Sequence, residues 1–286
     1  NKAKQLDKYA GERIDAIQLL AMTPGLPLVI KEFSMAWKGD SLNKGLLKKT
    51  AYDYKRFLTY ISEDQNYSDV YLIARDGRIV YSVGQHDDLG KNIYSDPYNK
   101  TGLAKAVEFA NYYSQPELSS FDYYPPIGQN AGFIAAPVYA DSLLVGAVAF
   151  RLNNEAINSI VNEYSGLGDT GEVILMQQKE KRMVFVSSTR FDNNAAFSRH
   201  IDISGGGLSG VIEKLREGYF ENVTLDYRSM HVIYTERYLP FLRCYMVVKQ
   251  DVDEAFGLIE SLQDTFIIVS LLMGILVFVF AHLISR

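Results

Sequence analysis

The fold of this chain is decided by the stretch Asp69-Val70-Tyr71-Leu72-Ile73-Ala74-Arg75-Asp76-Gly77-Arg78-Ile79-Val80-Tyr81-Ser82-Val83. Two runs rich in β-branched and aromatic residues flank Asp76-Gly77, a pair that favours the tight turn of a β-hairpin. A similar pair of runs returns later, at 172–176 and 183–187. The sequence therefore predicts two hairpins, each of which begins a module.

The same order of elements follows both hairpins. After the first we expect a helix, three strands and a second helix, at 101–112, 118–124, 131–139, 143–152 and 155–163. After the second we expect them at 208–216, 219–227, 230–238, 244–250 and from Asp251 onwards. Asn153 or Asn154 can cap the helix at 155–163, and Asp251 can cap the last one. Each half is thus expected to form a five-stranded antiparallel sheet in an α+β fold.

The segment before the first hairpin is expected to be helical. Its apolar residues recur at helical spacing until Pro24 and Pro27 interrupt the pattern, at Leu6, Ile14, Ile17, Leu19, Leu20 and Met22. Two more helical stretches follow, the last from about Ser41 to Glu63. We therefore divide the chain into N-terminal stalk helices at 1–66, a membrane-distal module at 67–154, a membrane-proximal module with its linking helix at 155–262, and a transmembrane helix at 263–286.

An apolar run near the C-terminus predicts that transmembrane helix. Phe266–Ile284 carries no formal charge apart from that of His282 when it is protonated. The run spans about 28 Å as a helix, close to the hydrocarbon thickness of a bilayer, and a buried core helix is rarely apolar on all sides. Arg286 follows the run, which predicts that residues 1 to about 264 lie in the periplasm or outside the cell, anchored in a bacterial inner membrane. An earlier transmembrane helix is then expected upstream of Asn1.

Composition narrows the class of protein. The net charge is −5 and no basic stripe occurs, so nucleic acid is not expected as a partner. The single cysteine, Cys244, excludes an intramolecular disulfide and a cysteine metal site, and its apolar neighbours predict a buried strand residue. The lack of disulfides fits a bacterial periplasmic domain with a core large enough to fold unaided.

No catalytic constellation is found in the sequence. The four histidines are scattered, without metal-ligand spacing, at His86, His200, His231 and His282. There is no P-loop and no nucleophile elbow. We therefore expect no catalytic residue, no metal and no cofactor in this chain. Asp87-Asp88 is interpreted as a turn, with cation binding as the alternative.

With that order of elements, the chain resembles the double-CACHE family of extracytoplasmic sensors. The resemblance covers residues 1 to about 262, and the matching stretches are 70–80, Asp88-Leu89-Gly90-Lys91-Asn92, Phe133–Tyr139 and Gly166–Glu172. It implies a long N-terminal helix and two PAS-like modules in a receptor that passes ligand binding to a cytoplasmic output domain. His282–Arg286 resembles the junction before a HAMP linker. A sensor histidine kinase is the first reading, with a chemoreceptor or a cyclase receptor as alternatives, and a homodimer paired along the N-terminal helices is expected.

The resemblance places the ligand in the membrane-distal module. Thirteen of the 20 tyrosines fall between residues 51 and 140. Tyrosine offers an apolar wall with a hydroxyl that orients a polar ligand, although it is also common in the core of a sheet. The candidate ligand-binding residues are Tyr71, Tyr81, Tyr94, Tyr98, Phe121, Asp122, Tyr123, Tyr124, Phe133, Ala135 and Arg151.

The class of ligand is inferred from two departures from the family. Members that bind amino acids carry an arginine and a tryptophan near the covering loop, and the corresponding stretch Asn92–Thr101 has neither. They also carry an aspartate on the last strand of the distal module, at or near the place of Arg151. Because an arginine repels an ammonium group and can clamp a carboxylate, an anionic or neutral ligand is favoured over an amine. A solvated strand end, or a salt bridge to Asp122, remains the alternative for Arg151.

Two other classes of function stay open. A non-switching interaction module would have a filled distal pocket. A periplasmic hydrolase anchored at its C-terminus would need a catalytic constellation, which the sequence does not supply.

Overall fold

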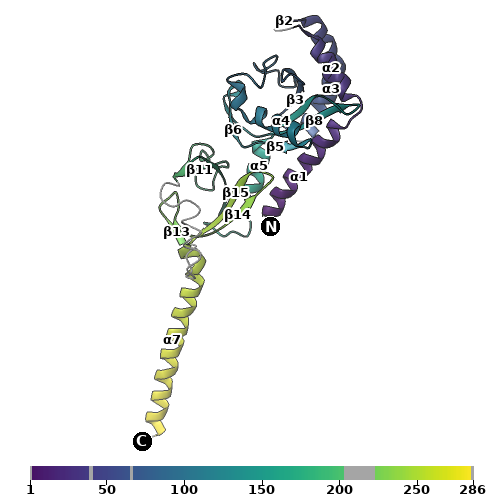
Figure 1. Cartoon of the computed structure of the whole chain (residues 1–286). Helices are drawn as coiled ribbons and strands as arrows, with labels where there is room; N and C mark the ends of the chain where they lie inside the picture. Colours follow the sequence, from purple (N-terminus) through teal and green to yellow (C-terminus); the bar gives the residue numbers. More distant parts are fainter. Residues whose placement is uncertain (1, 39–40, 65–66, 203–222, 285–286) are drawn as a thin grey trace. The chain divides into compact units, whose positions relative to one another are not determined.

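The computed structural model describes residues 2–38, 41–64, 67–202 and 223–284 (Figure 1). The chain divides into two compact units. The first comprises residues 1–163, 174–202 and 237–246, and the second comprises 164–173, 203–236 and 247–286, as far as these are described. The helix expected at 208–216 lies outside the described residues.

The first sheet grows from the hairpin that the sequence predicted. Gly77 adopts a φ of +89° in its turn, a value that glycine tolerates without strain. The sheet has five antiparallel strands in the order β4-β3-β9-β8-β5, as expected. Their bounds are β3 Asp69–Ala74, β4 Ile79–Ser82, β5 Glu117–Leu118, β8 Phe133–Ala140 and β9 Leu143–Arg151.

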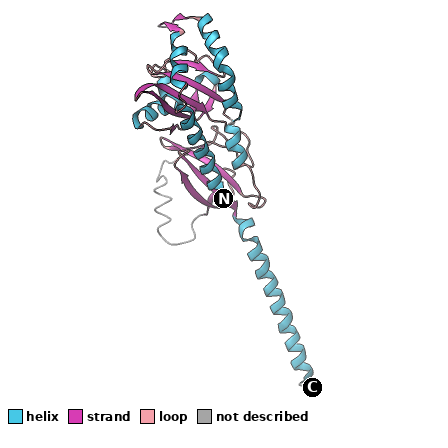
Figure 2. Cartoon of the chain, turned by 90° about the vertical axis from the view of Figure 1, so that its right-hand side faces the viewer, coloured by secondary structure: helices cyan, strands magenta, loops and turns pink. Residues whose placement is uncertain are grey.

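Helices cover both faces of this sheet (Figures 1 and 2). Helices α1, Lys2–Ala21, and α2, Leu26–Met35, pack against β8 and β9 on one face, and α3, Lys44–Asp64, contacts α2 and β3. Helix α4, Gly102–Tyr113, packs against β8 on the other face. The long N-terminal helix is therefore confirmed. A short ribbon that was not predicted, β1 (Trp37–Lys38) with β2 (Ser41–Leu42), separates α2 from α3.

A buried arginine fixes α1 to the sheet. The Arg13 guanidinium lies 4.2 Å from the ring centre of Tyr9 and 5.7 Å from that of Tyr67. Tyr67 in turn stacks on Phe150 of β9 at 4.0 Å between ring centres. Cation–π contact lets a charged side chain lie in an aromatic environment. The N-terminal helix is thus joined to the central strands by an aromatic stack.

The strand expected at 118–124 is divided in two. Only Glu117–Leu118 joins the main sheet, while β6, Asp122–Tyr124, pairs with β7, Gln129–Ala131, in a separate ribbon. Pro125-Pro126 directly follows β6 and forms a 3₁₀ turn. Because proline supplies no N–H to a ladder, the chain turns back at this point instead of extending the main sheet.

The second sheet has six strands, so the expectation of five is wrong for this half. Their order is β12-β11-β10-β15-β14-β13. The strand that was not predicted is β12, which pairs with β11 at the edge; three exposed residues are too short a run to show an alternating pattern. Cys244 is buried in a strand, as predicted. The bounds are β10 Glu172–Lys179, β11 Arg182–Phe185, β12 His200–Asp202, β13 Val223–Leu225, β14 His231–Leu239 and β15 Cys244–Asp251.

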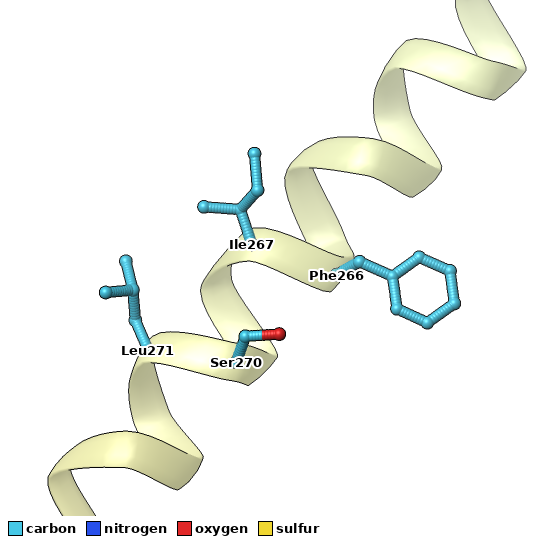
Figure 3. A pocket seen from close by; sticks show the side chains of 4 residues that line it. All are labelled: Phe266, Ile267, Ser270 and Leu271. Atoms are coloured by element: carbon cyan, nitrogen blue, oxygen red, sulfur yellow. The ribbon is translucent and has the colours of Figure 1, made fainter.

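Two more helices complete the described chain. Helix α5, Asn154–Val161, begins at Asn153, whose side chain accepts from the N–H of Glu155. Helix α7 runs from Val252 to Ile284, and Figure 3 shows four of its side chains projecting from the ribbon. Within the described part of the chain, no single helix is long and apolar enough to count as a membrane span. The apolar part of α7 covers Thr265–Val277. Helices α1 and α2 are long and apolar enough for a span only when they are taken together, and the chain bends by 71° between them.

The close contact of β9 with β3 gives a stability prediction. A Cβ on Gly146 would lie 2.2 Å from the carbonyl oxygen of Ile73, so Gly146→Ala should lower the unfolding free energy by about 1–3 kcal/mol, as overpacking does. Gly11 of α1 has no atom within 4 Å of such a Cβ, and Gly11→Ala should be neutral or stabilising by about 0.5–1 kcal/mol. Thermal unfolding of both variants checks this; a Gly146→Ala variant as stable as wild type would contradict the packing.

Candidate functional site

The candidate site lies on the face of the first sheet that α4 covers. Asp69, Arg151 and Phe133 are in register across β3, β9 and β8. Tyr71, Ala149 and Ala135 form the next row on the same face, because side chains alternate along a strand. The strand pairing therefore brings together four of the predicted site residues, Tyr71, Phe133, Ala135 and Arg151.

The part of this face under α4 is closely packed. Tyr71, Tyr124 and Phe133 are fully buried, and their ring centres lie 4.8 to 6.4 Å apart in edge-to-face contacts. The small side chains of Ala135 and Ala149 let α4 approach the sheet, with Leu103 and Val107 among the residues of this core. These aromatic residues therefore serve the core, and a ligand has no space among them in this state.

Beside this core lie two buried carboxylates, those of Asp69 and Asp88. Both residues have no exposed surface. Asp69 Oδ1 accepts the N–H groups of Val70 and Gly84 at 2.8 and 2.9 Å, and the Tyr124 hydroxyl donates to Asp88 Oδ2 at 2.5 Å. Asp69 Oδ2, Asp88 Oδ1 and the Tyr71 hydroxyl have no hydrogen-bond partner. Three buried polar atoms at one place are thus left unsatisfied, which is costly in a protein interior.

The electrostatics of this pair are also unbalanced. His86 Nε2 lies 3.6 Å from Asp69 Oδ2, a contact that carries charge only when the histidine is protonated. Burial raises the pKa of Asp88; the hydrogen bond from Tyr124 lowers it again in part, and the charge of Asp69 raises it further. Burial, then the charges of Asp69 and Asp88, and the approach of its hydroxyl to the Asp69 carboxylate raise the pKa of Tyr71 well above its ordinary value, while the charge of Arg151 opposes this rise. The site therefore disfavours a second negative charge and favours a cation.

The loop that carries Asp88 is held by Trp37. A Cβ on Gly90, where φ is +82°, would lie 2.0 Å from the Trp37 ring, so only glycine fits. Arg78 bridges the two, because its Nη1 donates to the Gly90 carbonyl at 3.0 Å and its guanidinium lies 5.6 Å from the Trp37 ring centre. The chain's one tryptophan thus reports on the loop of the site.

The structure places three other predicted tyrosines away from the buried carboxylates or toward solvent. Tyr81 points to the opposite face of the sheet and packs on Phe33 of α2, 4.5 Å between ring centres. Tyr94 and Tyr123 are 44% and 57% exposed. Tyr98 is half-buried in the loop after Asp88, and burial and then the charge of Asp88 raise its pKa.

Phe121 and Asp122 have structural partners in the first unit. Phe121 is buried, and its backbone N–H donates to Gln177 Oε1 at 2.9 Å. Asp122 pairs with Lys105 at 3.2 Å and Lys179 at 3.1 Å. The salt bridge considered between Asp122 and Arg151 is therefore not formed.

Arg151 instead lines a separate cavity. Its Nη2 donates to the carbonyl of Ser68 at 3.0 Å, and its Nε is buried without a partner. The cavity has a volume of about 140 Å³ and is bordered by β7, the end of β9 and the first residues of α5.

Sequence reasoning missed the importance of Asp69 and underestimated that of Asp88. Asp69 was read only as the start of a strand, and Asp88 as part of a turn. A polar residue that begins a run of buried strand residues could have marked Asp69, because such a position points onto the sheet face. For Asp88 the local sequence offers no signal, since two of the groups that act on it, Tyr124 and Asp69, lie far from it along the chain.

The described fold matches that of known ligand-binding domains. No protein-family model matches the sequence, and no curated protein resembles it closely enough to count as a relative. Among solved structures, the ligand-binding domain of the Pseudomonas aeruginosa amino acid chemoreceptor PctB, in complex with L-Gln, has a TM-score of 0.55 at 16% identity, over 92% of this chain and 94% of that one. The domain of the Pseudomonas fluorescens chemoreceptor CtaA with L-isoleucine has 0.52 at 12%, over 90% of each chain.

A third solved structure has a similar fold. The sensory domain of the Campylobacter jejuni chemoreceptor Tlp3, with isoleucine bound, has a TM-score of 0.52 at 12% identity, over 88% of this chain and 89% of that one. The chain thus has the fold of extracytoplasmic ligand-binding domains of chemoreceptors, which confirms the fold that the double-CACHE resemblance implied.

The raised pKa of Asp88 gives a pH prediction. The folded state holds this proton more tightly than the unfolded chain, so its stabilising effect is complete below the ordinary pKa of 3.8 and is lost as the pH rises through the raised value. An asparagine at position 88 does not titrate, so Asp88→Asn removes this loss of stability at higher pH. Relative to wild type, the variant should therefore gain unfolding free energy from acidic to neutral pH, as measured by urea unfolding.

The control for this experiment is Asp87→Asn, because Asp87 is the exposed neighbour in the same loop. It should leave the pH dependence of unfolding as in wild type. A stability difference between Asp88→Asn and wild type that stays constant with pH would contradict the burial of Asp88.

Proposed function

We propose that this chain is the extracytoplasmic sensing region of a membrane receptor of the chemoreceptor or histidine kinase type, and that its membrane-distal module, residues 67–154, binds a small molecule. The observation that carries the proposal is the pair Asp69 and Asp88, two fully buried carboxylates whose free oxygens have no hydrogen-bond partner. Buried carboxylates without a cation are costly for a fold, and sites of this kind are typical of function.

The chemistry of this pair favours a ligand with a protonated amine. An ammonium group supplies three donors, and Asp69 Oδ2, Asp88 Oδ1 and the Tyr71 hydroxyl oxygen can each accept one. The sequence-based preference for an anionic or neutral ligand rested on the lack of arginine and tryptophan in Asn92–Thr101 and on Arg151, and Arg151 lines a different cavity. The three solved chemoreceptor domains hold L-Gln or isoleucine, each of which carries an ammonium group.

The core under α4 has to be compared with the alternative of a non-switching interaction module. That alternative expects a filled distal pocket, and the face under α4 is filled. The unsatisfied oxygens at its border argue for a ligand nonetheless, because a purely structural core has no use for two unpaired carboxylates. Binding would require the loop of Asp88 and Tyr98 to move, and that loop is only half-buried at Tyr98.

The route of the signal runs through α7. Its 266–284 stretch is the proposed membrane span, which leaves residues 1 to about 264 outside the cytoplasm. In the second unit, Glu254 of the first turn of α7 accepts the N–H groups of Asp169 and Thr170 at 2.7 and 2.8 Å. A Cβ on Gly168 would lie 2.1 Å from its Oε1, so the loop fits closely around the carboxylate. The hydrogen bonds from Thr170 and Asp169 lower the pKa of Glu254 to about 2.

This clamp fixes the start of the output helix to the module that precedes it. The Thr170 hydroxyl accepts from the N–H of Asp251 at 3.0 Å and also donates to Glu254, so one side chain contacts the end of β15 and the start of α7. A displacement of the Gly166–Glu172 loop would therefore be passed to α7 directly.

Ligand binding is testable through Trp37. L-amino acids and small primary amines, each paired with its hydroxy analogue, are titrated into the full chain in detergent, and tryptophan fluorescence is followed. An amine should change the fluorescence saturably, and its hydroxy analogue should bind at least about tenfold more weakly, because hydrogen bonds to charged groups contribute about 1.5–3 kcal/mol. Asp88→Asn should lower the affinity for the amine by a similar factor.

The exposed Asp87→Asn should bind as wild type does. Equal binding of an amine and its hydroxy analogue, or an unchanged affinity in Asp88→Asn, would refute the amine site. If no compound of either series changes the fluorescence or the melting temperature, the sensing function itself is wrong.

The clamp gives a further prediction. Glu254→Ala leaves the N–H groups of Asp169 and Thr170 without their acceptor, so their hydrogen exchange should accelerate by about tenfold or more. Asp253→Ala, an exposed acidic residue in the same turn, is the matched control and should leave both amides protected. Exchange measured by NMR that is equal in the two variants would disprove the clamp.

A further inference from the structure

The cavity beside Arg151 differs in kind from the carboxylate site. It is polar, with a volume of about 140 Å³, and Ser68, Asn130, Asn153 and Asn154 are among its lining residues. Gln129 and Glu155, which also line it, are exposed, so the cavity can be reached from solvent. All of these residues belong to the first unit.

Two polar atoms of the cavity wall are buried and have no hydrogen-bond partner. One is a donor, the Nε of Arg151, and the other is an acceptor, the Oδ1 of Asn154. The orientation of the Asn154 amide is fixed, because its Nδ2 donates to the carbonyl of Asn130 at 3.2 Å. An occupant that satisfies both atoms must offer an acceptor to the arginine and a donor to the asparagine.

The charge of the cavity indicates the sign of the occupant. Arg151 is the cationic lining residue, and its Nη2 is already used by the Ser68 carbonyl. Its Nε therefore keeps one strong, charge-assisted donor for an anion. Glu155 is the one acidic residue of the lining, and its side chain is exposed while its N–H is capped by Asn153.

We propose that this cavity is a second binding site, which takes a small oxyanion that retains one O–H group, such as a short 2-hydroxycarboxylate or hydrogen phosphate. An anionic oxygen accepts from Arg151 Nε, and the O–H donates to Asn154 Oδ1. The volume corresponds to about four or five water molecules, which admits a ligand of this size and excludes a large metabolite.

The position of the site suggests what its occupancy changes. Arg151 ends β9 and Asn154 begins α5, the helix that leads from the distal module toward the second sheet. An anion bound between them would brace this connection. Arg151 is paired with Asp69 across β9 and β3, but none of the residues that line the cavity is Asp69, Asp88 or Tyr71, so the two sites use different ligating atoms.

Calorimetric titration tests the site with three probes: sodium glycolate, inorganic phosphate and sodium acetate, each added to the full chain in detergent. Glycolate or phosphate should bind one to one, and the stronger of the two identifies the class of oxyanion. Acetate, which lacks the O–H, should bind at least about fivefold more weakly than glycolate, because it leaves Asn154 Oδ1 unsatisfied.

Variants separate this site from the rest of the molecule. Arg151→Gln should lower the affinity for glycolate and for phosphate at least about tenfold. Asn154→Ala should abolish the preference for glycolate over acetate. The exposed Arg75→Gln is the control and should bind both probes as wild type does. A melting curve checks that each variant folds. If Arg151→Gln does not fold, the proposal is tested by whether Asn154→Ala loses the preference for glycolate over acetate.

The proposal is overturned if none of the three probes binds saturably, or if Arg151→Gln and Asn154→Ala bind them as wild type does. In the first case the cavity holds only water. Failure of this site would leave the amine site untouched, since Asp88→Asn and Trp37 fluorescence report on that site alone.

Discussion

The desolvation of the Asp69 and Asp88 carboxylates is the constraint on which the first sheet and its loops depend. Taking a carboxylate out of water is costly unless the protein returns donors to it. Here the donors are few: two backbone N–H groups for Asp69 and one tyrosine hydroxyl for Asp88. The Trp37 ring packs directly against Gly90 of the loop that carries Asp88. These carboxylates therefore lack a compensating hydrogen-bond donor on one oxygen each, and under the proposed function a cationic ligand would supply it.

The same strands connect this site to the N-terminal helices. Along β3, Tyr71 faces the carboxylates, while Val70 and Leu72 face the opposite side of the sheet. On that side Tyr81 packs on Phe33 of α2, and Phe150 stacks on Tyr67. A buried sheet is closely packed and resists local compression, so a shift of β3 or β4 is felt by the helices behind it. The site and the N-terminal helices thus pack on opposite faces of the same strands.

A structural feature could be predicted from the sequence where a short stretch of residues determines it. The Asp76-Gly77 turn and the β-rich runs on each side of it are local signals, and the first hairpin follows from them. The edge strand β12 and the split at Pro125 depend on partners far along the chain, and the predicted strand pattern missed both. For the site, the tyrosine-rich face was recognised, but a tyrosine in a core and one in a pocket have the same pattern. Asp88 lies beside Tyr124 and Asp69, which are distant along the chain, and no short stretch of sequence encodes that.

The most direct test of the account is the pKa of the Asp88 carboxyl group, followed by carbon-13 NMR in the free chain and with the amine that best changes Trp37 fluorescence. The account predicts a pKa above 3.8 in the free chain, because of burial, and a clear fall when the amine binds, because an ammonium group stabilises the charged carboxylate. An ordinary value in the free chain, or a value that the amine does not change, would contradict the claim that these carboxylates await a cation.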